Sequence, residues 1–296
     1  MGLFSYLRPD GPSHPEEAKL PKNRFKAYFD IVRNRFFLLL GLSLLTFLFF
    51  IPFYFWRIAW GAYIGLDPSA ELTAEELLYR EFVLRVTGSL VEWPLQLLSC
   101  FGLGGAFEVA SRLCHQEGSV FLWKDFKKGL RENYKSSLLA GALIGLGNFL
   151  FTLNSRFYPF LEGMPDWGSV AIAIVFALVM AFFHMWGYFL LSSSTLYRFR
   201  FKDSMKNTFL FSFILYPKNL LFLLLAALFP LLLELIPYLL VQEVLIGLIA
   251  VYGLAHLSLV YELYGLHVFD RYINSTYAPE EMGRGLGNEE EPRKEN

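Results

Sequence analysis

The chain of 296 residues has little of what several large protein classes require. It has only two cysteines, and if Cys100 and Cys114 lie on one helix they are about 21 Å apart at a rise of about 1.5 Å per residue. That distance excludes a bridge within the chain, so the sequence indicates neither a disulfide scaffold nor a zinc site. The net charge of −1 also lacks the basic excess expected of a nucleic-acid-binding protein.

Short motifs for common catalytic chemistry are also missing. The sequence has no phosphate-binding glycine loop, no His-Glu-x-x-His, no Gly-x-Ser-x-Gly and no carboxylate pair at hydrolase spacing. The loops predicted below to be cytoplasmic are short and basic, which leaves little room for a soluble catalytic domain. We therefore expect a protein that is not an enzyme and that uses no cofactor or metal. An enzyme acting within the membrane through histidines is the alternative.

Apolar residues, in contrast, are abundant. Hydrophobic residues make up 55% of the chain, aromatic residues make up 18%, and the mean hydropathy is +0.40. Residues 36–56 and 136–155 contain no charged side chain, and residues 167–197 contain only one titratable group, His184. Each run is long enough to cross about 30 Å of hydrocarbon as a helix, which takes about 20 residues. The sequence therefore predicts an all-α, polytopic membrane protein.

We expect six transmembrane helices, at about 36–57, 90–113, 136–157, 168–195, 218–238 and 243–265. They form one transmembrane domain over 36–266, between an N-terminal segment of residues 1–35 and a partly disordered C-terminal tail of residues 267–296. Thr73 and Glu76 have the spacing of a capping box, which predicts a short helix in the long outer loop 64–89. Stripes of small residues at 102–110 and 137–145 predict close helix packing.

The distribution of lysine and arginine predicts the orientation. With these spans, 22 of the 26 basic residues fall on one side, and only Arg57, Arg80, Arg85 and Arg156 fall on the other. Cytoplasmic loops carry the excess of basic residues. We therefore expect a multi-pass membrane protein whose two termini are both cytoplasmic, which requires an even number of spans.

A basic amphipathic stretch precedes each span that runs outward, and each stretch has an asparagine near its end. The stretches lie at 25–36, 122–135 and 199–217, with the asparagines Asn34, Asn133 and Asn219. A helix with one apolar face and one cationic face lies in the plane of the lipid headgroups. We interpret the chain as three degenerate units, each a basic interfacial helix followed by a helical hairpin.

The second of these stretches is the clearest predicted contact with anionic headgroups of the inner leaflet. Phe126, Leu130 and Tyr134 would form its apolar face, and basic side chains would cover the other face. We expect Asn133 to bond the backbone where this helix turns into the third span. The predicted interfacial anchors are Lys124, Lys127, Lys128, Arg131, Asn133 and Lys135.

The same region carries a family resemblance. A glycine-rich segment at 102–106 leads through Glu117-Gly118 into a Trp-x-x-Phe-x-x-x-x-x-x-Asn-aromatic-Lys pattern at 123–135. This pattern, with the opening Met1-Gly2-Leu3-Phe4-Ser5, resembles the YesL-like family of bacterial integral membrane proteins, whose function is unknown. The long loop 64–89 and the proline-glycine spacing of the second span depart from the family pattern. The resemblance implies a non-enzymatic accessory component associated with carbohydrate uptake, with a carbohydrate ABC transporter as partner.

Ionisable residues within the spans are the candidate functional residues: His184, His256, Glu108, Glu262 and Arg112. Such groups are costly in hydrocarbon, so they suggest function by default. They support the alternative of an autonomous small-solute transporter or channel. The competing interpretations are neutral histidines hydrogen-bonded between helices, and ion pairs formed by Glu108, Glu262 and Arg112 at the inner ends of the spans.

Overall fold

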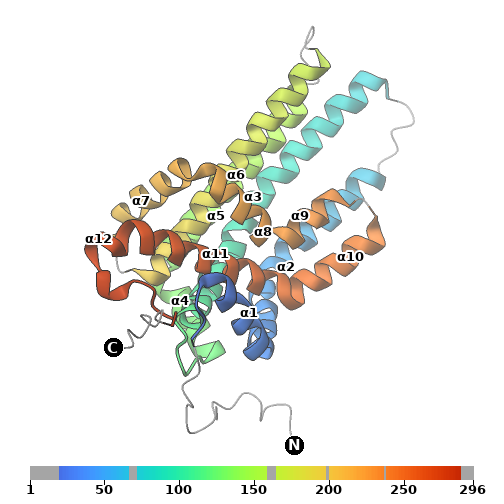
Figure 1. Ribbon diagram of the computed structural model, residues 1–296. Helices are drawn as coiled ribbons and strands as arrows, with labels where there is room; N and C mark the ends of the chain where they lie inside the picture. The colour runs from blue at the N-terminus through green and yellow to red at the C-terminus, as the bar shows by residue number, and fades with distance from the viewer. Residues whose placement is uncertain (1–19, 67–71, 159–164, 198–199, 237, 288–296) are drawn as a thin grey trace, which may run out of the picture.

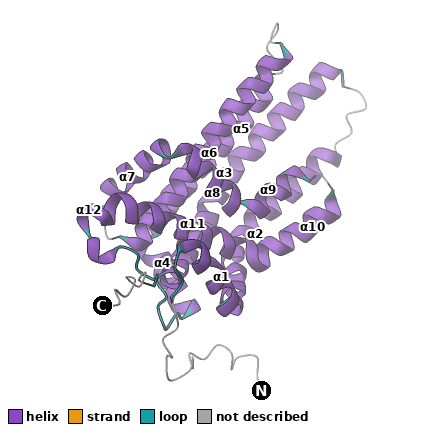
Figure 2. Ribbon diagram, viewed as in Figure 1, coloured by secondary structure: helices purple, strands orange, loops and turns teal. Residues whose placement is uncertain are grey.

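The computed structural model describes residues 20–66, 72–158, 165–197, 200–236 and 238–287. Within these ranges the regular elements are helices and none is a strand (Figure 2), which confirms the predicted all-α class. Five helices are long and apolar enough to cross a membrane, and a bent pair of helices brings the number to six. Residues 1–19 of the predicted N-terminal segment, 67–71 of the outer loop and 288–296 of the tail lie outside the described residues.

The first unit consists of α1 (Arg24–Asn34), α2 (Phe36–Leu66) and α3 (Ala74–Cys114). Asn23 caps α1, because its side chain accepts a hydrogen bond of 2.8 Å from the backbone of Lys26. The predicted capping box is present at Thr73, but the helix that it starts is not short. It continues without a break to Cys114, since each added residue of a formed helix gains another backbone hydrogen bond.

The second unit repeats this order of a short helix followed by two longer ones, whereas the first helix of the third unit is followed by three shorter helices before a longer one (Figure 1). The second unit consists of α4 (Leu122–Glu132), α5 (Tyr134–Phe157) and α6 (Asp166–Leu196). The third unit consists of α7 (Phe201–Ile214), α8 (Tyr216–Ala226), α9 (Leu228–Leu235), α10 (Leu239–Leu248), the π-helical turn Ile249–Gly253 and α11 (Leu254–Phe269), and it ends in the π-helical turn Asp270–Asn274, α12 (Ser275–Tyr277) and the 3₁₀ turn Pro279–Glu281.

The third unit departs most from the predicted spans. The segment predicted as a fifth span is α8 and α9, which are separated at Ala227. Pro230 has no N–H to donate to the carbonyl of Ala226, so the helix is interrupted there. A bend of 97° separates α7 from α8, where Pro217 starts the new helix. The last span is longer than predicted, since it runs over Leu240–Tyr277 and past the expected boundary at residue 267.

The core is organised around α3, which packs against α2, α4, α5, α6 and α11. Small residues allow two of these close contacts. A Cβ on Gly141 of α5 would lie 2.7 Å from the Cα of Leu97, and a Cβ on Gly129 of α4 would lie 2.7 Å from the carbonyl oxygen of Gly104. The predicted stripe at 137–145 therefore serves the packing of α5 on α3, as the sequence indicated.

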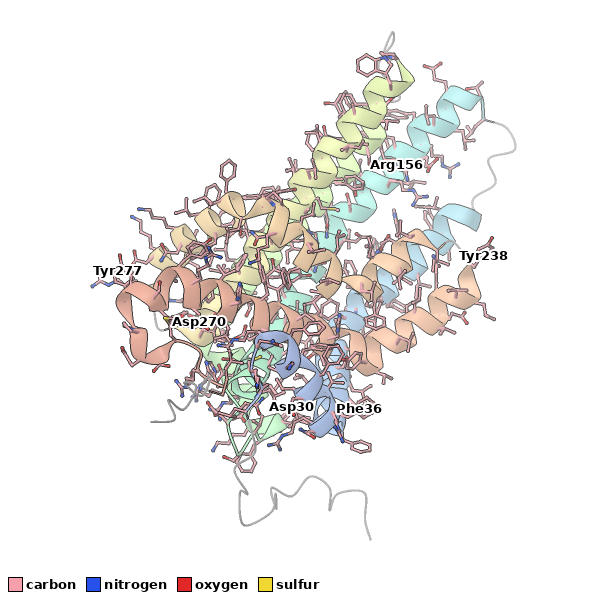
Figure 3. All side chains as sticks on the ribbon, in the orientation of Figure 1. Asp30, Phe36, Arg156, Tyr238, Asp270 and Tyr277 are labelled. Atoms are coloured by element: carbon pink, nitrogen blue, oxygen red, sulfur yellow. The ribbon has the colours of Figure 1, made fainter. Side chains whose placement is uncertain are left out.

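Different segments and ion pairs lie at the two ends of the molecule. At one end, called the basic end below, α1 and α4 lie beside the C-terminal segment. Arg24 forms a salt bridge of 2.8 Å with Asp270, and the backbone of Gly287 bonds Pro21. At the opposite end, Arg156 of α5 lies 3.6 Å from Glu81 of α3. Figure 3 shows Asp30 and Phe36 far from Arg156 and Tyr238. The first and last described segments therefore lie at the same end.

Candidate functional site

His184 and His256, predicted as buried ionisable groups, are both hydrogen-bonded within the protein. His184 Nδ1 lies 2.9 Å from the carbonyl oxygen of Met180, one turn earlier on α6. His256 Nε2 lies 2.9 Å from the carbonyl oxygen of Leu225, and its Nδ1 lies 2.8 Å from the hydroxyl of Tyr28. A carbonyl only accepts, so His256 donates from Nε2 and accepts from Tyr28 at Nδ1. Both rings thus have structural partners, and His256 ties α1 to α8 and α11.

Glu108 and Arg112 belong to an ion network between α3 and α4. Lys128 Nζ lies 2.6 Å from Glu108 Oε1, and Arg112 Nε lies 3.6 Å from the same oxygen. Arg112 also lies 3.1 Å from Oδ1 of Asp125, a carboxylate that is 1% exposed. Asp125 Oδ2 accepts a hydrogen bond of 2.8 Å from the backbone of Phe121, where α4 begins. The network fixes the short helix α4 on the end of α3.

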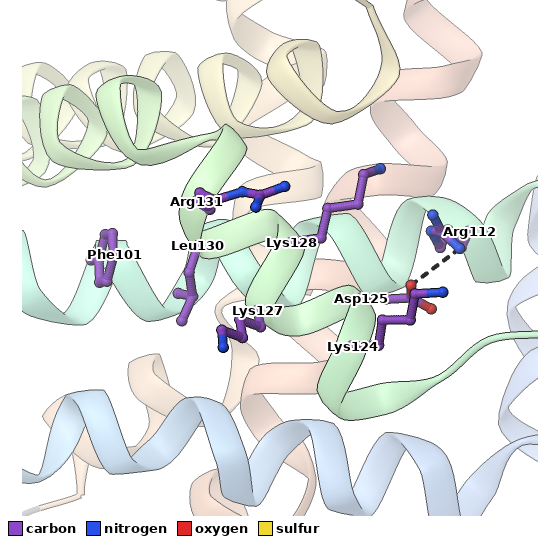
Figure 4. Close-up of a pocket in the computed structure, with 8 residues that line it drawn as sticks. All are labelled: Phe101, Arg112, Lys124, Asp125, Lys127, Lys128, Leu130 and Arg131. Carbon is purple, nitrogen blue, oxygen red and sulfur yellow. Dashed lines mark ion pairs between the residues drawn. The ribbon is translucent and has the colours of Figure 1, made fainter.

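A groove of about 520 Å³ runs along α3 beneath α4. Figure 4 shows four basic side chains spread along α4, with Phe101 at one end of the groove and Arg112 near the other. Lys124, Lys127 and Arg131 are exposed, whereas Lys128 is held by Glu108. α4 buries Asp125, Phe126 and Gly129, so α3 contacts part of the face that the sequence assigned to lipid. Of the other predicted anchors, Lys135 is exposed beside the ring of Tyr134.

Asn133 does not make the backbone bond that we expected. Its side chain is 5% exposed at the junction of α4 and α5, but its Nδ2 has no hydrogen-bond partner. The corresponding residue of the third unit does what we predicted for Asn133. Asn219 Nδ2 donates to the carbonyl oxygen of Phe211 at 2.9 Å, which joins α8 to the end of α7. Asn34, in the first unit, donates to Asp30 at 2.8 Å. The three asparagines therefore have three different bonding patterns.

Beside Asn133, a crevice of about 360 Å³ opens between five helices. Its wall combines a lysine that pairs with two carboxylates, several hydroxyls, the amide of Asn133 and two aromatic rings. The lining residues are Glu108, Lys128, Glu132, Asn133, Lys135, Ser136, Ser194, Thr195, Leu196, Tyr197, Phe201 and Ser204. Asn133 lines the crevice, and its buried Nδ2 is a donor without a partner in the protein. This crevice is the candidate functional site.

Glu262 lies behind the wall of the crevice. Its carboxylate is 0% exposed, and Thr195, which also lines the crevice, donates to its Oε1 at 2.8 Å. Neither Glu262 Oε2 nor Ser192 Oγ has a hydrogen-bond partner. Arg24, Arg112 and Lys128 pair with other carboxylates, and none of the salt bridges of the described residues includes Glu262. Of the five predicted intramembrane residues, only Glu262 has a buried polar atom without a partner.

Sequence reasoning missed two parts of this arrangement. Ser192 and Thr195 resemble ordinary helix residues, and only the approach of α11 shows that they face Glu262. Arg57, which we assigned only to the outer surface, bonds Glu234 of α9 and lies 3.7 Å from Glu92 of α3. A lone arginine among acidic residues at span ends could have indicated an ion pair. The sequence could not have shown which carboxylates form that pair.

No family model, no curated protein and no solved structure matches this chain. The resemblance to the YesL-like family therefore stays a prediction from the residues quoted above. The candidate site has to be interpreted from its own chemistry.

Proposed function

We propose that this protein is a non-enzymatic accessory component of carbohydrate transport in the bacterial plasma membrane. The crevice is the observation that carries the proposal. A polyhydroxylated solute needs donors and acceptors on several sides and an apolar surface for its ring. The crevice supplies the free amide of Asn133, hydroxyls from α6 and α7, and the rings of Tyr197 and Phe201. Its volume of about 360 Å³ is typical of a small-molecule site.

The proposed orientation places the basic end, and with it the mouth of the crevice, on the cytoplasmic side. Its support is the excess of basic residues on this side and the contact between the first and last described segments. The exposed lysines of α4 would then lie among anionic headgroups of the inner leaflet. Such lipids attract each nearby lysine or arginine by about 1 kcal/mol.

Titration calorimetry on the purified protein in nanodiscs, with a panel of mono- and disaccharides, tests the proposal. At least one sugar should bind, and Asn133→Leu and Phe201→Ala should weaken its binding. Phe213→Ala is the matched control, since Phe213 lies on the same helix, is exposed and does not line the crevice. If no sugar binds, or if the control weakens binding equally, the crevice is not a carbohydrate site.

An autonomous small-solute transporter is the second candidate, and the burial of Glu262 next to the crevice favours it. The two candidates differ in what the protein does alone. An accessory component should co-purify with a transporter and should move no solute by itself in liposomes. A transporter should catalyse uptake in liposomes unaided and should lose uptake with Glu262→Gln. Unaided uptake would contradict the accessory role.

A further inference from the structure

Four oxygen-bearing side chains from three helices converge at Glu262 of α11. Thr195 of α6 donates to Oε1 at 2.8 Å. The hydroxyls of Ser192 and Ser111 lie near this carboxylate, and that of Ser192 makes no hydrogen bond to it. Ser192 lies close to the backbone of α11, because a Cβ on Gly265 would lie 2.3 Å from Ser192 Oγ. Glu262, Ser192 and Ser111 are 0%, 0% and 5% exposed. The cluster is therefore packed inside the protein and faces away from lipid.

The charge of this cluster is not balanced within the described part of the chain. An ionised carboxylate buried without a counter-charge is expensive, so such groups are paired or bind a metal ion. Two basic side chains at this end are engaged elsewhere, since Lys128 and Arg112 pair with Glu108, and none of the described salt bridges includes Glu262. Two buried oxygens of the cluster, Glu262 Oε2 and Ser192 Oγ, also have no hydrogen-bond partner. Buried polar atoms of this kind need an explanation such as a bound ion.

We propose that Glu262, Ser192, Thr195 and Ser111 form a binding site for a sodium ion. The ligands are all hard oxygens, which suit a hard cation and do not suit a transition metal. One carboxylate supplies one negative charge, which a monovalent cation neutralises. A divalent ion such as Ca²⁺ is bound by six to eight oxygens, several of them from carboxylates, and the cluster holds only one carboxylate.

Thr195 provides the route to this site. Its hydroxyl contacts Glu262 and its side chain also lines the crevice, so an ion in the crevice is one side chain away from the carboxylate. Ion binding would hold α3, α6 and α11 together through their shared ligands. The sodium site does not depend on which solute occupies the crevice, because none of its ligands other than Thr195 lines the crevice.

The test is thermal unfolding of the purified protein in nanodiscs at constant ionic strength, with NaCl replacing choline chloride or KCl. Sodium should raise the melting temperature in a saturable way, and potassium should do so less. Ser192→Ala keeps the carboxylate but loses one ligand, and it should weaken the apparent sodium affinity about tenfold. Glu262→Gln should abolish the sodium effect.

Two matched controls are available. Glu234→Gln removes a carboxylate at the opposite end, and Ser258→Ala removes a buried hydroxyl that bonds only its own helix, to Leu254 and Ala255. Both should keep the sodium effect of the parent. If sodium stabilises no more than choline, or if infrared spectra show that Glu262 stays protonated in saturating sodium, a proton neutralises the carboxylate and the proposal is wrong. Equal loss of the effect in the controls would also contradict it.

Discussion

At the scale of single residues, the hydrogen bonds of a buried asparagine amide distinguish a structural junction from a candidate binding surface. Asn219 is 0% exposed and uses both ends of its amide, since Nδ2 bonds Phe211 and Oδ1 accepts from Tyr264 at 2.5 Å. Asn133 is almost as buried, but its Nδ2 bonds nothing in the protein. The two asparagines occupy similar places in their units, so their bonding, and not their position, distinguishes their roles.

Asn219→Ala should therefore destabilise the protein much more than Asn133→Ala. The first substitution leaves the buried hydroxyl of Tyr264 without a partner, at a cost of about 1–3 kcal/mol. It also removes one bond to the carbonyl of Phe211, which keeps its bond from the backbone of Leu215. The second removes an amide nitrogen that makes no bond. Thermal unfolding in detergent measures both variants. An equal fall in melting temperature in the two variants would mean that the bonds of Asn219 add little stability.

Two glycines near the C-terminus give a second comparison at this scale. Gly283 and Gly285 both have positive φ, at 69° and 82°, a conformation that costs other residues roughly 1 kcal/mol or more. A Cβ would meet nothing at Gly283, whereas at Gly285 it would lie 2.3 Å from the carbonyl oxygen of Cys114. Gly285→Ala should therefore release the C-terminal segment from α3, which limited proteolysis would detect. Gly283→Ala should keep it docked, and faster cleavage in both variants would mean that φ alone decides docking.

At the scale of elements, α4 combines two roles that its sequence pattern does not separate. Phe126 and Gly129 pack on α3, and Lys128 completes the ion network, so this side holds the fold. Lys124 and Lys127 are exposed and contact no carboxylate in the described salt bridges, so this side is available to headgroups. The helix is thus partly a core element and partly a surface element.

Single charge reversals in α4 should separate these roles. Lys128→Glu places a second carboxylate beside Glu108 and should lower the melting temperature, because like charges then meet in a half-buried site. Lys127→Glu should leave the melting temperature close to that of the parent but should weaken the preference for anionic lipids in nanodiscs, by about 1 kcal/mol for each lost attraction. If both variants melt like the parent, the ion network does not stabilise α4.

At the scale of the whole molecule, the contact between the first and last described segments favours an even number of spans. Five helices pass as spans by themselves, and an odd number would place the two termini on opposite sides. Arg24 and Asp270, however, lie 2.8 Å apart. An even number of spans would need a sixth crossing, and the bent pair α7 and α8 is the candidate for it.

Reporter fusions test this topology directly. Fusions after Phe25, Lys128 and Arg284 should report the cytoplasmic side, because they follow segments at the basic end. Fusions near Glu76 and Gln242 should report the external side. A cytoplasmic signal at Gln242 would mean that the bent pair α7 and α8 forms a re-entrant loop, and an external signal at Arg284 would overturn the arrangement of the two termini.

The sequence by itself determined the all-α class, five of the six predicted spans and the order of elements in the first two units, because these depend on run length, charge and caps that act locally. Thr73 and Glu76 could be recognised as a capping box since its two residues lie within one turn. The tertiary structure alone decided which of the polar groups found partners. His256 meets Tyr28 from 228 positions away, whereas Glu262 meets two hydroxyls of α6 and no cation among the described residues. Helix crossings set these distances, and no local pattern in the chain records where two helices cross.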